Sequence, residues 1–299
     1  MSVKNGLLTL PEDEDLLRIP GFCPDGIPAG EGCPIIRTLL HEWPLSRVEL
    51  AAFPELPGTP RRIVKTQLAL ASAEGDFYRF AGPLFREIRG DLRIPELLGR
   101  ESAGDSEWLI LSHEPGEKED WSGLSPDGIR ERVRRIGEVL QMPILKEAPV
   151  FTDWSAPERF AADLTEDIPV LLSGGAEKPE RIPDWAAGNG GICWESPCGL
   201  LHGDLKADNL LTGEGGTVLL DWQRPMRAPL PLEAELSVLL ERGLPEPGSP
   251  APADRPFAAL ACFSLSHWYA WAWRTCLPWP FVLGQAVKYA EAGLAMIME

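Results

Sequence analysis

The segment between residues 201 and 222 constrains this chain more than any other part of its sequence. It begins LHGDLKADNLL over 201–211, and twelve residues after Asn209 a β-like run reaches Asp221. A hairpin turning at 213–216 would return Asp221 toward the loop that carries Asp204 and Asn209. Phosphoryl transfer needs such a cluster, because a carboxylate must take the proton of the attacking hydroxyl and oxygen ligands must hold Mg²⁺ against the phosphates.

These residues resemble a known family. The pattern H-G-D-L-x-x-x-N from His202, followed by a strand ending in Asp221-Trp222, resembles the catalytic and metal loops of the aminoglycoside phosphotransferase and choline kinase-like family. The resemblance implies a protein-kinase-like fold that moves the γ-phosphate of ATP to a small-molecule hydroxyl. It implies that Asp204 is the catalytic base, that Asn209 and Asp221 bind Mg²⁺, and that His202 fixes the loop. A polar hairpin arising by chance in an α/β protein is the alternative.

Two neighbouring features bear on the kind of kinase. Lys206 gives the form D-L-K, which resembles Ser/Thr protein kinases, and its cation can contact a transferring γ-phosphate. Asp221-Trp222-Gln223 lacks the glycine of D-F-G, and the short run 223–232 leaves little room for an activation segment. We therefore favour a small-molecule kinase over a protein kinase.

A second match lies in the first third of the chain. Lys65 ends the alternating run RIVK and resembles the strand lysine that holds nucleotide phosphates. Its usual partner is a helix glutamate, and Glu74 begins an E-x-x-F-Y pattern similar to that of the family. Nine residues separate the two, fewer than is usual in the family, so Glu87 is the alternative partner. A lysine on an edge strand at the surface is the alternative for Lys65.

The remaining nucleotide contacts are expected on either side of that strand. The apolar run 108–111 and the turn 112–116 stand where the hinge between lobes would lie, so backbone groups from Ser112 to Glu114 are expected to bind the adenine edge. An ordinary strand and turn is the alternative. The chain has neither G-x-G-x-x-G nor G-x-x-x-x-G-K-[ST]. Where a phosphate-covering loop is expected it reads EWPLSRV over 42–48, in which Ser46 is the candidate phosphate donor and a solvated turn the alternative.

Periodicity predicts an α+β architecture, a bilobal fold with a β-rich N-terminal lobe and a mainly helical C-terminal lobe. We expect the nucleotide-binding lobe over 1–111, the hinge over 112–116, and the catalytic and substrate-binding lobe over 117–299. The first 34 residues, acidic and rich in Pro and Gly, are expected to wrap the surface. Segment 174–197 shows no clear pattern. The predicted strands are 48–53, 62–67, 108–111, 200–201, 210–212 and 217–222, and the predicted helices are 74–85, 129–140, 157–172, 257–274 and 281–298.

The composition of the chain limits which partners it can bind and in which cellular compartment we expect it. The 299 residues carry a net charge of −17, which disfavours nucleic acid and anionic membranes as partners. Six cysteines without a C-x-x-C pair argue against zinc, and we expect them to be reduced. The N-terminus has no basic region followed by an apolar run, and polar residues interrupt 257–273, so we expect a cytoplasmic protein without a membrane span.

The sequence constrains the identity of the acceptor substrate least. Trp268, Tyr269 and Trp271, with the acids Glu233 and Glu235, could hold a cationic or sugar-like ligand, and the alternative is that these rings fill a helical core. Trp273, Trp279 and Glu241 complete this set. The resemblance implies an aminoglycoside or other antibiotic, an amino alcohol such as choline, or a sugar. A nucleotide-binding pseudokinase that regulates a partner, or less favoured a protein kinase, is the alternative function. The oligomeric state stays open.

Overall fold

The structure is a computed structural model that describes residues 3–23, 34–54, 58–87, 91–245 and 254–298. The chain forms two compact units. Unit 1 comprises Met1–Glu119 and Asp208–Gln223, and unit 2 comprises Asp120–Ala207 and Arg224–Glu299. This division differs from the predicted lobe boundaries, because the 208–223 segment pairs with strands of unit 1 although it follows much of unit 2 in the sequence.

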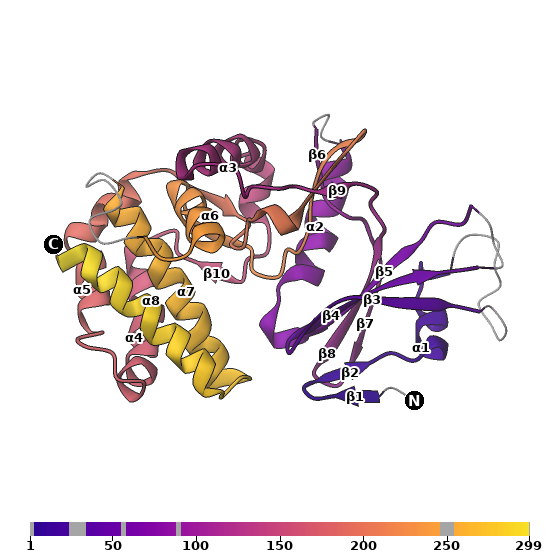
Figure 1. Cartoon of the computed structure of the whole chain (residues 1–299), viewed down its shortest axis with the longest axis horizontal. Coiled ribbons are helices and arrows are strands. Elements are labelled where there is room, and N and C mark those ends of the chain that lie inside the picture. Colours follow the sequence, from indigo (N-terminus) through magenta and orange to yellow (C-terminus); the bar gives the residue numbers. More distant parts are fainter. Residues whose placement is uncertain (1–2, 24–33, 55–57, 88–90, 246–253, 299) are drawn as a thin grey trace. The chain divides into compact units, whose positions relative to one another are not determined.

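Unit 1 is built on a five-stranded antiparallel sheet (Figure 1). In spatial order its strands are β3 (Ile36–Trp43), β4 (Ser46–Ala52), β5 (Arg62–Leu68), β8 (Ser106–Ser112) and β7 (Leu97–Ala103). The central strands β5 and β8 carry aliphatic side chains such as Val64 and Ile110, both fully buried. After β5, one 3₁₀ turn (Ala69–Ala71) leads directly into α2 (Glu74–Glu87). The strand and helix predictions for this region are confirmed.

The N-terminal segment enters the core of unit 1, so the expectation that residues 1–34 only wrap the surface was wrong for its described part. The segment forms β1 (Val3–Asn5), β2 (Leu8–Leu10) and α1 (Asp13–Arg18). Leu16, Ile19 and Phe22 are buried in one cluster with residues of β5 and β8. One apolar residue of α1 and two from the turn that follows it therefore anchor an otherwise acidic segment. Residues 24–33, which include Cys33, lie outside the described residues.

The predicted hairpin forms and belongs to a second sheet of unit 1. This sheet has the order β6 (Leu92–Arg93), β13 (Gly216–Leu219), β12 (Leu210–Gly213) and β9 (Glu117–Lys118). In the hairpin, Leu210 pairs with Leu219. β13 ends three residues earlier than predicted. The backbone of Asp221 has a φ of 63°, in the left-handed region that no strand can accommodate.

Unit 2 is mainly helical, as predicted (Figure 1). Its helices are α3 (Pro126–Leu140), α4 (Pro157–Ser173), α5 (Arg181–Ala187), α6 (Pro231–Arg242), α7 (Arg255–Thr275) and α8 (Pro280–Met298). A small sheet has the order β10 (Thr152–Asp153), β14 (Met226–Pro229) and β11 (Cys198–Leu201). Segment 174–197 contains α5 and a 3₁₀ helix over Asn189–Glu195. Within the described residues, no helix combines the length and apolarity that a membrane span requires.

The core of unit 2 is aromatic at its centre. Phe160 of α4 is fully buried and meets Trp154, Trp185 and Phe263 edge-on or tilted, with ring centroids 4.9 to 6.2 Å apart. Such contacts add to the free energy of burial because the positive edge of one ring faces the negative face of another. The ring of Phe160 therefore packs α4 against Trp154, against α5 and against α7.

Replacing Phe160 with alanine is expected to lower the free energy of unfolding by about 3–5 kcal/mol, because the cavity left in this core cannot close fully. Urea unfolding followed by circular dichroism measures the change. Phe281→Ala is the matched control, since the side chain on α8 is 62% exposed; its effect should stay within about 0.5 kcal/mol. Equal effects of the two substitutions would contradict this description of the core.

Candidate active site

The first part of the candidate site lies in unit 1 and centres on Lys65. This residue is 4% exposed on the central strand β5. Its Nζ lies 2.5 Å from Oε2 of Glu74 and 2.5 Å from Oδ1 of Asp221. Glu74 is the first residue of α2 and is fully buried, whereas Glu87 is exposed at the other end of that helix. Nine residues are enough for Lys65 and Glu74 to form an ion pair, because only one 3₁₀ turn separates β5 from α2.

The charges of this cluster are strongly coupled. Burial, with a smaller contribution from the Asp221 carboxylate, raises the pKa of Glu74 to about 7, although Lys65 opposes the shift. Burial lowers the pKa of Lys65, but Asp221 and Glu74 together outweigh it and hold that pKa above its usual value. Tyr78, one turn along α2, interacts with Glu74 and with the main chain of Asp221. Lys65 is therefore a buried cation held between two carboxylates.

Asp221 is held in an unusual conformation by its neighbours. Its φ is 63°, which is strained for a residue other than glycine and persists only where surrounding contacts enforce it. The next ring, Trp222, stacks on Phe77 of α2 with centroids 4.0 Å apart. One residue further, the carbonyl of Gln223 accepts a hydrogen bond of 3.0 Å from the Ala73 amide. These contacts fix Asp221 beside Lys65, where its side chain keeps 35% exposure.

Asn209 lies at the same open end of the hairpin as Asp221. Its carbonyl accepts a hydrogen bond of 2.8 Å from the amide of Leu220, directly before Asp221. An amide oxygen and one carboxylate suit Mg²⁺, which binds proteins through one or two carboxylates and takes its other ligands from water and substrate phosphates. Across the residues that the structure describes, no three His, Cys, Asp or Glu side chains form a group that could hold a metal ion. Metal binding by Asn209 and Asp221 stays a prediction.

The second part of the candidate site is the loop of residues 202–206 in unit 2. The Asp204 side chain is 13% exposed, and its oxygens lie 3.0 Å from Nη2 of Arg224 and 3.3 Å from Nζ of Lys206. The amide of Asp204 donates a hydrogen bond of 3.3 Å to Nδ1 of the buried His202. Asp204 is thus a carboxylate placed between two cations, which can receive a proton while the cations attract a phosphoryl group.

Two glutamates of α6 hold the main chain of this loop. Glu233 accepts hydrogen bonds of 2.5 Å from the His202 amide and 3.3 Å from the Gly203 amide. Glu241 accepts one of 2.7 Å from the Ala207 amide. Burial raises the pKa of Glu233 to about 7, against the opposing effect of these amides. The loop is therefore anchored by α6 at both ends.

Gly203 allows the loop to pass close to the segment that follows Gln223. Its φ is 79°, and a Cβ at this position would lie 2.2 Å from the carbonyl oxygen of Arg224. Any side chain would therefore push apart the two segments that carry Asp204 and Arg224.

An aromatic cluster adjoins Asp204 within unit 2. The Arg224 guanidinium lies 4.5 Å from the ring centroid of Trp268. Trp268 stacks on Trp271 at 5.2 Å, and the Phe151 ring meets both edge-on. A pocket of about 460 Å³ opens beside this cluster. The pocket is lined by Phe151, Thr152, Asp153, Arg159, Ala162, Asp163, Glu166, His267, Trp271 and Arg274.

The acids predicted beside the tryptophans have other roles. Glu233 and Glu241 hold the main chain at the two ends of the 202–206 loop, and Glu235 forms a two-pronged ion pair with Arg130 at 2.6 and 3.0 Å. Tyr269 stacks on Tyr289, Trp273 packs against the core, and Trp279 is 45% exposed. Sequence reasoning missed Arg224 and the acids lining the pocket, because no motif marks them and only the packing of unit 2 brings them near Trp271.

The other predicted nucleotide contacts lie in unit 1. Segment 42–48 forms the end of β3, a two-residue turn and the start of β4, where Ser46 is 5% exposed and pairs with Gln67. The Ser112 amide donates a hydrogen bond of 2.9 Å to the Glu96 carbonyl, and its hydroxyl donates one of 2.6 Å to Glu114. Nucleotide binding by Ser46, Ser112 and Glu114 stays a prediction.

The segment after Asp221 bears on the protein-kinase alternative. Only Trp222 to Pro225 separate Asp221 from β14, and α6 begins at Pro231. The connection contains no extended segment comparable to a kinase activation loop, which disfavours a protein kinase.

The raised pKa of Glu233 predicts a pH dependence of stability. The folded pKa of about 7 exceeds the ordinary 4.5, so between these values the folded state binds more protons than the unfolded state. The free energy of unfolding should therefore fall as pH rises from about 4.5 to 7, by up to about 3 kcal/mol from this group. Glu233→Gln should remove that part of the slope, measured by urea unfolding at pH 5 and 7.5.

Glu138→Gln, at an exposed position on α3, is the control and should leave the slope unchanged. An unchanged slope in the Glu233 variant would contradict this assignment.

Comparison with solved structures supports the fold. A choline/ethanolamine kinase family protein from Mesorhizobium loti is 14% identical, with 92% of each chain covered and a TM-score of 0.58. A choline kinase from Cryptosporidium parvum is 13% identical, covers 94% of this chain and 91% of its own, and gives 0.55. An amicoumacin kinase in complex with AMP-PNP, Ca²⁺ and Ami is 12% identical, covers 87% and 88%, and gives 0.53. The predicted α+β, protein-kinase-like fold is confirmed.

Comparison with curated proteins finds no match. The sequence profile described as the phosphotransferase enzyme family matches residues 61–276. That range contains Lys65, Glu74, Asp204, Asn209 and Asp221, the residues on which the resemblance depends. Because the match covers more than half of the 299 residues, the chain belongs to the phosphotransferase enzyme family and is a small-molecule phosphotransferase.

Proposed function

We propose that this enzyme transfers the γ-phosphate of ATP, with Mg²⁺, to a hydroxyl group of a small molecule. The observation that carries the proposal is the buried cation Lys65, held at 2.5 Å from both Glu74 and Asp221. Burying a lysine is unfavourable unless it is paired. A lysine oriented by one buried and one partly exposed carboxylate is suited to binding phosphate oxygens.

On the donor side, unit 1 supplies three of the proposed contacts. Lys65 binds phosphate oxygens of ATP, while Asn209 and Asp221 hold Mg²⁺. When bound, Mg²⁺ would supply positive charge that offsets the negative charge of the phosphates. Glu74 keeps the Lys65 ammonium in place, and the packing of Trp222 on Phe77 keeps Asp221 oriented for both partners.

On the acceptor side, unit 2 supplies the proposed base. The acceptor oxygen forms a bond to the γ-phosphorus as the bond from that phosphorus to the bridging β-phosphate oxygen breaks, which releases ADP. The hydroxyl proton passes to a carboxylate oxygen of Asp204. Lys206 and Arg224, at 3.3 and 3.0 Å from Asp204, supply positive charge beside the group in transfer.

We propose the pocket beside Trp271 as the binding site of the acceptor. In its lining the three carboxylates of Asp153, Asp163 and Glu166 outnumber the two guanidiniums of Arg159 and Arg274, and the Trp271 and Phe151 rings lie beside them. Carboxylates and aromatic faces both attract organic cations, so an acceptor with amino groups suits this pocket. An aminoglycoside or other antibiotic, an amino alcohol and an amino sugar all meet that description.

We also propose that the enzyme works in the cytoplasm, where ATP is available. The five cysteines that the structure describes are free thiols. Burial raises the pKa of Cys193 and of Cys262 to about 12, so both thiols stay protonated and unreactive.

Asp204→Asn is expected to lower kcat by about 10²–10⁴-fold, because the amide cannot accept the hydroxyl proton. Purified protein with Mg-ATP is offered pools of aminoglycosides, other antibiotics, amino alcohols and sugars, and mass spectrometry detects a product heavier by one phosphoryl group. Asp208→Asn is the matched control, since that carboxylate is exposed and pairs with Lys118 at the surface. It should keep wild-type activity.

Equal activity of the Asp204 variant and the wild type would exclude Asp204 as the base. If the wild type bound Mg-ATP but modified no compound of any pool, either the acceptor lies outside these pools or the pseudokinase alternative holds.

Lys65→Met is expected to weaken Mg-ATP binding at least about tenfold, because the phosphates lose a charged hydrogen-bond donor. The fold should survive, since Glu74, with its pKa near 7, can take up a proton once its partner is gone. Isothermal titration calorimetry measures the affinity, and circular dichroism checks the fold. Lys118→Met, at an exposed position, is the control. A folded Lys65 variant with wild-type affinity would show that this lysine does not bind the nucleotide.

A further inference from the structure

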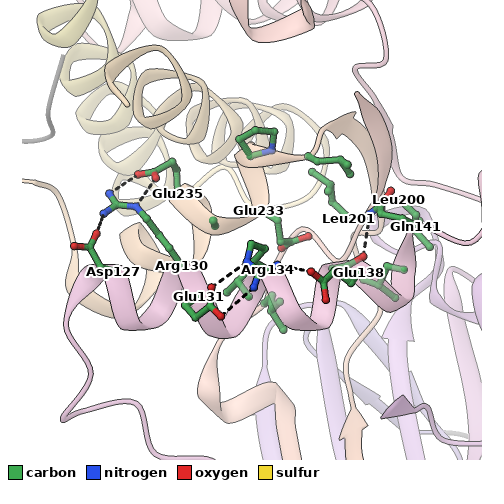
Figure 2. Close-up of a pocket in the computed structure, with 17 residues that line it drawn as sticks. Asp127, Arg130, Glu131, Arg134, Glu138, Gln141, Leu200, Leu201, Glu233 and Glu235 are labelled. Atoms are coloured by element: carbon green, nitrogen blue, oxygen red, sulfur yellow. Dashed lines mark hydrogen bonds and ion pairs between the residues drawn. The ribbon is translucent and has the colours of Figure 1, made fainter. Parts of the chain in front are cut away.

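A second pocket of unit 2 lies between α3, β11 and α6 and has no role in the proposed reaction. Its volume is about 510 Å³, which lies in the range of small-molecule sites. Figure 2 shows α3 along one side, with Leu200 and Leu201 of β11 and Glu233 of α6 facing it. The pocket differs in its residues from the pocket beside Trp271, because the two share no lining side chain.

The interior of this pocket is aliphatic. The apolar lining residues are Val133, Leu140, Leu200, Leu201, Leu205, Leu230, Pro231 and Ala234. Gly137 of α3 also lines the pocket, and a Cβ built there meets no atom within 4 Å. The space next to Gly137 is therefore empty, and a larger side chain at this position would fill part of the pocket. Binding of a hydrophobic ligand to this aliphatic surface is favourable, because it removes apolar side chains from water.

Charged side chains of α3 border the interior, and they are already paired. Arg130 bonds to Glu235 at 2.6 Å and to Asp127 at 2.7 Å (Figure 2). Arg134 bonds to Glu131 at 2.9 Å and also to Glu138.

Apart from Glu233, the lining therefore carries four carboxylates against two guanidiniums. Both guanidiniums of the lining are engaged with carboxylates. Arg135, outside the lining, also pairs with Glu131 at 2.9 Å, so one negative charge remains in excess and attracts a cation.

The pocket also touches the groups that hold the catalytic loop. Leu205 directly follows Asp204, and Leu201 directly precedes His202. The carboxylate of Glu233 lines the pocket and accepts the amide hydrogen bonds of His202 and Gly203. A ligand seated here would pack against both sides of the segment that positions Asp204, so its binding energy can stabilise that segment.

We propose that this pocket, defined by α3, β11 and α6, is a ligand site for a hydrophobic organic cation. The ligand has an aliphatic or aromatic body that fills the space beside Gly137 and one positive charge directed to the α3 carboxylates. Occupancy makes the 202–206 loop more rigid through Leu205 and Glu233. The site is separate from the proposed ATP and acceptor sites, and its test requires neither nucleotide nor acceptor.

The binding test uses n-octylammonium, which has no hydroxyl to be phosphorylated, and octanoate as an anion with the same length of chain. Calorimetry on the full chain at pH 7.5 should give one saturable site for the cation and at least about tenfold weaker binding for the anion. Gly137→Leu should fill the pocket and weaken cation binding at least about tenfold. Gly284→Leu is the matched control, because that glycine of α8 also has no atom within 4 Å of a built Cβ and lies outside the pocket.

Hydrogen exchange of the peptide covering 200–206 gives the second readout. Octylammonium should slow exchange of the His202 and Gly203 amides in the wild type and in the Gly284 variant, but not in the Gly137 variant. Equal affinity for cation and anion, or unchanged cation binding in a folded Gly137 variant, would overturn the ligand site. Saturable binding at this pocket without any change in exchange would overturn the link to the catalytic loop.

Discussion

The ion pairs of Lys65 are the interaction on which the candidate site of unit 1 depends. A lysine on the central strand of a sheet would be expelled to the surface unless carboxylates met it inside. Glu74 does so from the first turn of α2, and Asp221 does so from the end of a hairpin that lies 156 residues away in the sequence. One buried charge therefore ties together a strand, a helix and the candidate metal ligands. The strained backbone of Asp221 is compatible with the fold because this pair and the stacking of Trp222 on Phe77 both hold it.

Unit 2 holds its part of the site in a different way. There the buried group is the carboxyl of Glu233, and its partners are main-chain amides of the 202–206 loop. Main-chain bonds leave the side chains of the loop free to choose other partners, which is why Asp204 can face Arg224 and Lys206. The main chain of the loop is thus held by α6, while two ion-pair partners of the Asp204 side chain, Lys206 and Arg224, lie outside α6. This division allows the anchor and the reactive group to be altered separately.

The sequence predicted the parts of this arrangement that are local or that carry a motif. The hairpin, the helix starting at Glu74 and the helices α3, α4, α7 and α8 of unit 2 each have a pattern within one segment, whereas α5 lies in a segment without a clear pattern. The partner of Lys65 was left open between Glu74 and Glu87, because spacing alone does not say how tightly the chain turns after β5. The anchoring roles of Glu233 and Glu241 could not be predicted, since nothing in the sequence states which face of α6 meets the loop. The burial of Leu16 and Phe22 was missed because the acidic residues around them dominate the composition of that segment.

The cations of the candidate site have one property in common that bears on how an anionic substrate would bind. Lys65, Lys206 and Arg224 each lie beside a carboxylate, in a chain whose net charge is −17. Under the proposed function, a nucleotide phosphate that approaches Lys65 would compete with Asp221 for the same ammonium. If Asp221 binds a metal ion when the phosphate binds Lys65, the Asp221 carboxylate is again next to a positive charge. Replacement of Asp221 by the phosphate at Lys65 would then be favourable. Binding of the metal and binding of the nucleotide would then each favour the other, because either one alone leaves a carboxylate or a phosphate without its counter-charge.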